Sequence, residues 1–455
     1  MATWGASTSL RHVQRTRFAR ALPALGHFLC LIGVRNRYRI FLSHRQRKDR
    51  MKALINEQQQ ATRPPTFRFH LALSFLAFIM IGANDGALGV LLPGMQNYYH
   101  VDKAIISLLF LCSTLGYFIA SFNNGLLIEK LGKQRALMLG TAIFLGGTVV
   151  LSLAPPFALA LGAFLLGGFG IAMLDAGLNS YVAELPNNTT KLNYLHFFYG
   201  IGAWLGPIVA SGLLAAQLGW NSAYMAWCGF SFLVLLALGL VFKDHASTKD
   251  KTEKTGKDNL LLSTLKLRVV WVAALFLLIY VGAEVSLGNW GYSFLVEERH
   301  GSTLISGWVI SGYWLGLSLG RLILGHLGAK IGNKNLIQLC LLGVVIGLLL
   351  IWLVPVEAAS AIGICLTGFC LGPIFPTTIA LMPSLVSGRV LATAIGFLAS
   401  LGSMGAALFP WLAGNLAQYA GLWSLLPYVI ILTIVMLGLW LLLQRRPDAE
   451  APASL

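Results

Sequence analysis

Apolar runs of about 20 residues, separated by brief polar turns, fill the chain from Phe69 onward. A run of this length crosses the roughly 30 Å hydrocarbon core of a bilayer as an α-helix, which satisfies its own backbone hydrogen bonds. We therefore expect an all-α membrane protein. The twelve predicted spans are residues 69–92, 103–128, 134–154, 157–185, 192–217, 221–242, 269–295, 303–328, 334–354, 358–385, 389–417 and 422–443.

The composition supports this class. Hydrophobic residues make up 56% of the chain and charged residues 11%, and the mean hydropathy is +0.73. No soluble domain of this length has such values. The six cysteines lie in apolar segments without a CxxC pair, so they suggest neither a disulfide framework nor a zinc site. We expect no metal and no cofactor.

The formal net charge of +16 indicates orientation rather than a nucleic-acid partner. Fourteen of the 33 Lys and Arg residues precede Phe69, and most of the others fall in alternate loops between the predicted spans. This is the positive-inside pattern. We expect a multi-pass protein of the cell (inner) membrane with both termini in the cytoplasm, acting as a monomer in the lipid bilayer.

Residues 1–68 form a basic N-terminal extension, for which three interpretations stay open. It is a disordered cytoplasmic tail, a segment like a transit peptide, or the product of a start codon placed too far upstream. We favour the last, because Met51 opens a short polar lead that ends at Pro65, just before the first span. The apolar run 21–34 is too short to span a bilayer.

The chain contains a duplication with a constant offset of 200 residues. Residues 243–268 read as a cytoplasmic linker between an N-terminal six-helix bundle (69–242) and a C-terminal one (269–443), followed by a cytoplasmic tail (444–455). We expect two pseudo-symmetric bundles with a binding site between them near the midplane. The glycine pairs in register are Gly82 and Gly282, Gly116 and Gly316, Gly125 and Gly325, Gly132 and Gly332, Gly168 and Gly368, and Gly202 and Gly402.

Acidic residues break this repeat. Asp175 lies inside span four and Asp85 inside span one, and neither has an acidic residue at the matching position of the second half. A charge at mid-membrane costs about 2.5–3.5 kcal/mol on insertion scales, so such a residue is a functional candidate. Burial favours the neutral carboxyl group, which suits coupled proton loading and release. Asp175 and Asp85 are the proton-coupling candidates; the alternative is an Asp kept protonated by a neighbouring helix.

We expect a cavity lined by spans one, four, five, seven, eight, ten and eleven. Trp290 or Tyr313 would stack on an apolar ligand face, although packing is the commoner role of such rings. We assign Arg321 a gating or structural role near the cytoplasmic end of span eight, paired with an acid. Pro207 and Pro376 interrupt helical hydrogen bonding and are gating candidates. The hydrogen-bonding candidates are Asn84, Asn179, His196, Glu284 and Asn289.

Several motifs resemble a known family. GLLIEKLGK (125–133), with Glu129 and Lys130, resembles the loop signature G-x-x-x-D-R-x-G-R of the major facilitator superfamily, whereas its second copy has Ala329 at the acidic position. LNYLHFFYGIGAWLGP (192–207), YVGAEVSLGNW (280–290) and GPIFPTTIA (372–380) resemble the fucose/galactose/glucose:proton symporter family.

The resemblance implies the major facilitator fold and proton-coupled alternating access for a small polar solute such as a sugar. It implies a gating role for Glu129 and Lys130 and a proton-coupling role for Asp175. His196 and Glu284 stand where that family has Gln, and Asp85 lies one turn before the place of its span-one Asp, which is Gly89 here.

Other functions remain as alternatives. Residues 202–207 partly match the span-five signature of drug:proton antiporters, but Ala210 and Ser211 replace its last two glycines. A sensor that has lost transport is a third hypothesis. An enzyme is the least expected, because the sequence has no catalytic triad motif, phosphate loop or metal cluster. The expected partners are a small-molecule substrate and protons.

Overall fold

The computed structural model describes residues 67–185, 188–241 and 260–444. The chain divides into two units, Met1–Phe67 and Arg68–Leu455, and the description below concerns the second. The predictions for residues 1–66, for 242–259 of the linker and for the tail from residue 445 lie outside the described residues.

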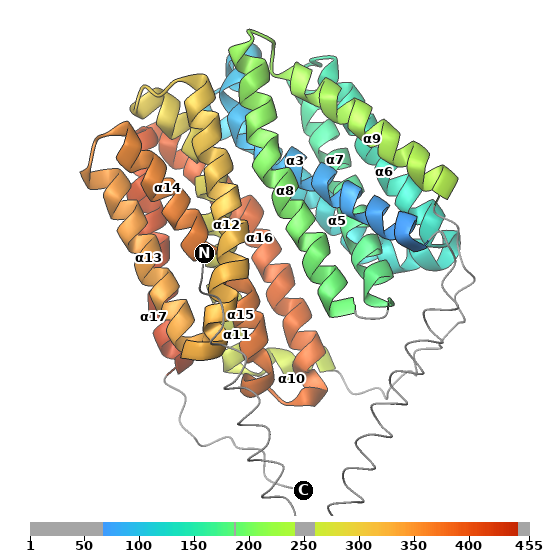
Figure 1. Ribbon diagram of the computed structural model, residues 1–455, viewed down its shortest axis with the longest axis vertical. Helices are drawn as coiled ribbons and strands as arrows, with labels where there is room; N and C mark the ends of the chain where they lie inside the picture. The colour runs from blue at the N-terminus through green and yellow to red at the C-terminus, as the bar shows by residue number, and fades with distance from the viewer. Residues whose placement is uncertain (1–66, 186–187, 242–259, 445–455) are drawn as a thin grey trace, which may run out of the picture. The chain divides into compact units, whose positions relative to one another are not determined.

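Helices fill both halves of this unit (Figure 1). The first half contains α3 (Phe67–Tyr99), α4 (Lys103–Ile106), α5 (Leu108–Leu131), α6 (Lys133–Ser152), α7 (Phe157–Ala183), α8 (Asn188–Ala215) and α9 (Asn221–Val241). The second contains α11 (Arg268–Ser293), the π-helical turn η1 (Phe294–Glu298), α12 (Thr303–Ile331), α13 (Asn333–Leu353), α14 (Glu357–Leu371), α15 (Ile374–Leu385), α16 (Gly388–Ala420), the 3₁₀ turn η2 (Leu422–Ser424) and α17 (Leu425–Gln444). Each predicted span coincides with one of these helices or with two in succession.

The fold class is therefore confirmed, with differences in detail. Among the described residues, eleven helical segments are long and apolar enough to cross a membrane. The predicted span in α12 is not among them, and it is the one that carries Arg321 in its interior. The first helix continues through Pro93 to Tyr99, beyond the predicted end at 92. The predicted linker ends in a short helix, α10 (Leu260–Leu265). The boundaries of the two bundles stay a prediction.

Two of the glycine pairs in register, Gly116 with Gly316 and Gly168 with Gly368, pack in the same way in both halves. A Cβ atom on Gly116 would lie 1.9 Å from the carbonyl oxygen of Leu165, and one on Gly316 would lie 2.7 Å from that of Cys365. Gly168 and Gly368 approach the carbonyl oxygens of residues 113 and 313 just as closely. The partners are thus also 200 residues apart. Only glycine allows these approaches, so α5 packs on α7 as α12 packs on α14.

The two halves meet where α4 and α5 pack on α16, where α8 packs on α12 and where α3 packs on α11 at Gly89. We call the end of the unit that contains Lys103 and Glu297 the Lys103 end. There the Lys103 ammonium lies 2.9 Å from the Glu297 carboxylate, and the Lys103 backbone N–H donates to Gln418 Oε1 at 3.0 Å. The opposite end contains the starts of α6, α13 and α16.

Candidate functional site

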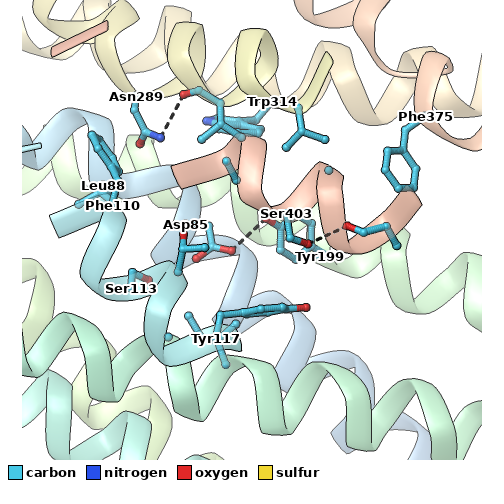
Figure 2. Close-up of a pocket in the computed structure, with 18 residues that line it drawn as sticks. Asp85, Leu88, Phe110, Ser113, Tyr117, Tyr199, Asn289, Trp314, Phe375 and Ser403 are labelled. Carbon is cyan, nitrogen blue, oxygen red and sulfur yellow. Dashed lines mark hydrogen bonds between the residues drawn. The ribbon is translucent and has the colours of Figure 1, made fainter. Parts of the chain in front are cut away.

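A cavity of about 350 Å³ lies between the two halves (Figure 2). Its walls come from α3, α5, α7 and α8 of the first half and from α11, α12, α15 and α16 of the second. The seven spans expected around a cavity all contribute. The sequence reasoning missed α5, which contributes Phe110, Ser113, Thr114 and Tyr117.

Asp85 is the one charged residue among those that line this cavity. Its carboxylate accepts hydrogen bonds from Asn84 Nδ2 at 3.2 Å and from the Tyr199 hydroxyl at 3.0 Å. Tyr199 reaches it because α3 lies close against α8: a Cβ atom on Gly86 would lie 2.4 Å from the Ala203 carbonyl oxygen. The site therefore holds a half-buried carboxylate that accepts from two helices.

Asp175 lies behind the cavity wall. It accepts a hydrogen bond from the Tyr117 hydroxyl at 2.7 Å and one from Asn179 Nδ2 at 2.8 Å. The predicted placement of Asp175 and Asn179 on one helix face agrees with this contact. Tyr117 itself lines the cavity, so its hydroxyl group connects the cavity to Asp175. His196 is exposed, and its ring lies edge-on to Phe78 with centroids 5.7 Å apart.

Glu284 and Arg321 form an ion pair in the second half. Glu284 is buried, and its Oε1 lies 3.7 Å from Arg321 Nη2. The Arg321 Nε–H donates to the Gly372 carbonyl oxygen at 3.2 Å. Arg321 thus pairs with an acid, as expected, but it lies about three turns before the end of α12 rather than near that end. Neither residue is among those that line the cavity.

Asn289 lines the cavity with only 5% of its surface exposed. Its Nδ2 donates to the Val285 carbonyl oxygen at 3.1 Å, and its Oδ1 has no hydrogen-bond partner among the described residues. A buried polar atom without a partner is uncommon in native structures. Asn289 therefore has one acceptor position left over.

Trp290 and Tyr313, the rings expected to stack on a ligand, lie outside the cavity wall. Trp290 is fully buried and donates from Nε1 to the Pro410 carbonyl oxygen at 2.9 Å. Tyr313 is also fully buried and donates to the Glu284 backbone carbonyl at 2.7 Å. Neither lines the cavity in this structure; Trp314 and Phe375 do. The sequence showed aromatic residues in these spans, but it did not fix which face of each helix points inward.

The gating candidates differ in what surrounds them. α8 continues through Pro207 without interruption. The span that contains Pro376 is broken between Leu371 and Ile374, and Pro376 lies in the first turn of α15. Glu129 and Lys130 are exposed near the end of α5. The functional roles of all these residues stay predictions.

Comparisons with known proteins agree with the fold and the motifs. The model of the Major Facilitator Superfamily matches residues 74–306 and 276–455. Bypass of stop codon protein 6 of Saccharomyces cerevisiae is 24% identical over 413 residues, which is 83% of this chain and 82% of that protein. A glucose/galactose transporter of Brucella abortus is 25% identical over 280 residues, 56% of this chain and 66% of that protein.

Solved structures show the same fold. The crystal structure of a bacterial homolog of the human lysosomal transporter Spinster, inward-facing and unoccupied, has a TM-score of 0.74 at 14% identity and covers 84% of this chain and 98% of that one. The crystal structure of the fucose:proton symporter of E. coli has a TM-score of 0.57 at 16% identity and covers 83% of this chain and 98% of that one. The resemblance to proton symporters of sugars is confirmed at the level of the family and the fold.

Proposed function

This chain belongs to the Major Facilitator Superfamily, and we propose that it moves a small polar solute across the membrane by proton-coupled alternating access. Transport as such follows from the family. The proton coupling and the polar solute are the proposal. So are the cell-membrane location, the cytoplasmic termini, the expected monomer and the roles of the individual residues.

The observation that carries the proposal is the pair of acids in the first half. Asp85 lies in the cavity wall, and Asp175 lies behind it and is reached through the Tyr117 hydroxyl. Each is a carboxylate inside a membrane-spanning helix, hydrogen-bonded to a tyrosine from another helix. Moving an unpaired charge through a closing cavity is costly, so the neutral acid favours reorientation. Proton loading and solute movement are thereby linked.

A sugar is the first candidate substrate. It is supported by the resemblance in residues 192–207, 280–290 and 372–380, and by the similarity to a glucose/galactose transporter and to a fucose:proton symporter. Drug or metabolite export in exchange for protons is the second candidate. The charge and aromatic rings of the cavity favour it. A sensor that has lost transport remains the third.

The test is transport in proteoliposomes that contain the purified full chain. Sugar-driven proton uptake indicates symport, and proton release driven by a cationic dye indicates antiport. Asp175→Asn, which imitates the protonated acid, should abolish uphill accumulation while it preserves substrate binding and exchange. Neither of these requires proton release.

Asp85→Asn belongs in the same assay, because Asp85 is the other proton-coupling candidate. Uphill accumulation that persists in Asp175→Asn but disappears in Asp85→Asn would assign the coupling to Asp85. Accumulation that persists in both variants would contradict the proposal.

A further inference from the structure

We propose that the cavity binds a protonated organic amine with an apolar ring system, whose ammonium group lies against Asp85 and Asn289. The inference rests on the proton-coupled transport proposed above and specifies the solute of its second candidate, export in exchange for protons. Three properties of the wall support it: its charge, its aromatic rings and its free hydrogen-bonding atoms.

The charge of the wall is negative. Asp85 is the one ionisable carboxylate among the lining residues, and that lining contains no Lys, Arg or His. Arg321, the cation in the interior of α12, is held by Glu284 and the Gly372 carbonyl outside the lining. A carboxylate in a low-dielectric cavity is stabilised by a cation and opposes an anion. The electrostatics therefore select a cationic solute over a carboxylate or phosphate.

Aromatic rings surround the same space. Five of the lining residues are aromatic, and they come from both halves: Phe110, Tyr117, Tyr199, Trp314 and Phe375. Figure 2 shows all five around the cavity that holds Asp85 and Asn289. Cations attached to apolar groups bind aromatic faces through the ring quadrupole, and the apolar groups gain from burial. Most of the other lining side chains are aliphatic or lack polar atoms.

The lining offers acceptors for an ammonium group: the Asp85 carboxylate only accepts, and the hydroxyl groups of Ser113 and Thr114 can accept as well as donate. The hydroxyl groups of Tyr117, Tyr199 and Ser403 already donate, to Asp175, Asp85 and the Ala399 carbonyl respectively. Asn289 Oδ1 has no partner among the described residues. An ammonium group carries donors and no acceptor, so it matches Asp85 and Asn289.

The Trp314 indole N–H has no partner among the described residues either, but its nitrogen is buried. The hydroxyl groups of Ser113 and Thr114 are the lining donors that a ligand oxygen could meet. A hexose, with a hydroxyl group on almost every carbon, would place others of its hydroxyls against aromatic and aliphatic side chains. This wall thus suits an aryl amine better than a hexose.

The amine and a proton compete for the same carboxylate. When Asp85 is protonated, a bound ammonium takes the place of its proton, which passes to the solvent. The other titratable groups that face Asp85 are Tyr199 from α8, Asp175 from α7 and Tyr117 from α5. Glu284 and Arg321, from α11 and α12 of the second half, interact electrostatically with Tyr199. Binding of the amine should therefore weaken as the pH falls.

The experiment uses three ligands with one ring system and different charges: 2-naphthylmethylamine, 2-naphthylmethanol and 2-naphthoate. Binding to the full chain in nanodiscs is measured by equilibrium dialysis at pH 7.5, with protein-free nanodiscs as the blank. We expect the amine to bind at least tenfold more tightly than the alcohol and the carboxylate. Asp85→Asn should weaken amine binding at least tenfold and change alcohol binding less than twofold.

Asp102→Asn is the matched control. It removes the same charge outside the cavity, and asparagine can still accept from the Ile105 N–H as the N-cap of α4. It should leave all three affinities unchanged. If Asp85→Asn does not fold, proton release from the wild-type protein is the second readout: the amine should release protons in weak buffer, and the alcohol should not.

Equal binding of the amine and the alcohol, or an amine preference that survives in Asp85→Asn, would overturn the inference. Amine binding without coupled proton flux in proteoliposomes would support the solute class and contradict the coupling proposed above. Proton uptake driven by D-glucose or L-fucose, without amine binding, would leave the proposed function standing and reject the amine.

Discussion

Asp85 and Asp175 each accept a hydrogen bond from a tyrosine in a distant part of the sequence. Tyr117 is 58 residues from Asp175, and Tyr199 is 114 residues from Asp85. The acids themselves were visible in the sequence, because a carboxylate stands out in an apolar run. The tyrosines were not, because tyrosine is an ordinary residue in membrane helices and only the helix packing makes it a partner. The same limit explains why Trp290 was chosen and Trp314 missed.

Arg321→Lys should lower transport without changing substrate preference. The guanidinium serves two partners, the Glu284 carboxylate and the Gly372 carbonyl, and an ammonium group keeps the charge but loses the planar fork that reaches both. Since Arg321 does not line the cavity, the ligand contacts should persist. Initial uptake rates for a panel of solutes would test this, and a changed order of preference would contradict it.

At the scale of helices, small residues determine how closely the spans approach. The offset of 200 residues was readable from the sequence, and the structure shows its physical basis in the paired approaches of Gly116 and Gly316. The sequence could not separate glycines that pack from glycines that do not. Gly125 and Gly325 are in the same register, yet a Cβ built on either would meet no described atom within 4 Å beyond its chain neighbours and the nearby backbone of its own helix.

Gly116→Ala should destabilise the protein by roughly 1–3 kcal/mol, because the added methyl group would lie 1.9 Å from the Leu165 carbonyl oxygen and would push α5 away from α7. Gly125→Ala, in the same helix, is the matched control. It should be neutral or stabilising by about 0.5–1 kcal/mol, since alanine restricts the unfolded chain more than glycine does. Thermal unfolding of both variants in detergent measures the difference, and equal effects would refute the packing argument.

At the scale of the whole transporter, contacts between the halves at the Lys103 end have to break for the cavity to open there. The Lys103–Glu297 pair is partly exposed, with 16% and 38% of the two side chains accessible. Exposed pairs contribute about 0.2–1 kcal/mol, so this pair biases the conformational equilibrium by no more than about fivefold. The sequence could not indicate this pair, since the two residues lie 194 positions apart.

Lys103→Glu should therefore change the rate of substrate exchange by up to about fivefold, and adding Glu297→Lys should restore it. The effect should shrink at 1 M salt, where charges are screened within about 3 Å. Exchange rates of the two variants at low and high salt provide the measurement. A double variant as impaired as the single one would indicate that the charge pair is not the cause.

The break between α14 and α15 is a candidate hinge of the transporter. The carbonyl groups of Leu371 and Gly372 accept hydrogen bonds from Tyr280 and Arg321, which belong to α11 and α12. Pro376 has no N–H with which to bond the Gly372 carbonyl in the helix. Turning α15 against α14 would therefore break the two hydrogen bonds from Tyr280 and Arg321. The backbone hydrogen bonds within each helix would stay intact. α15, the twelve-residue helix that contributes Phe375 to the cavity wall, thus follows a break whose two carbonyl groups are held by side chains, and one of these, Arg321, is also the partner of Glu284.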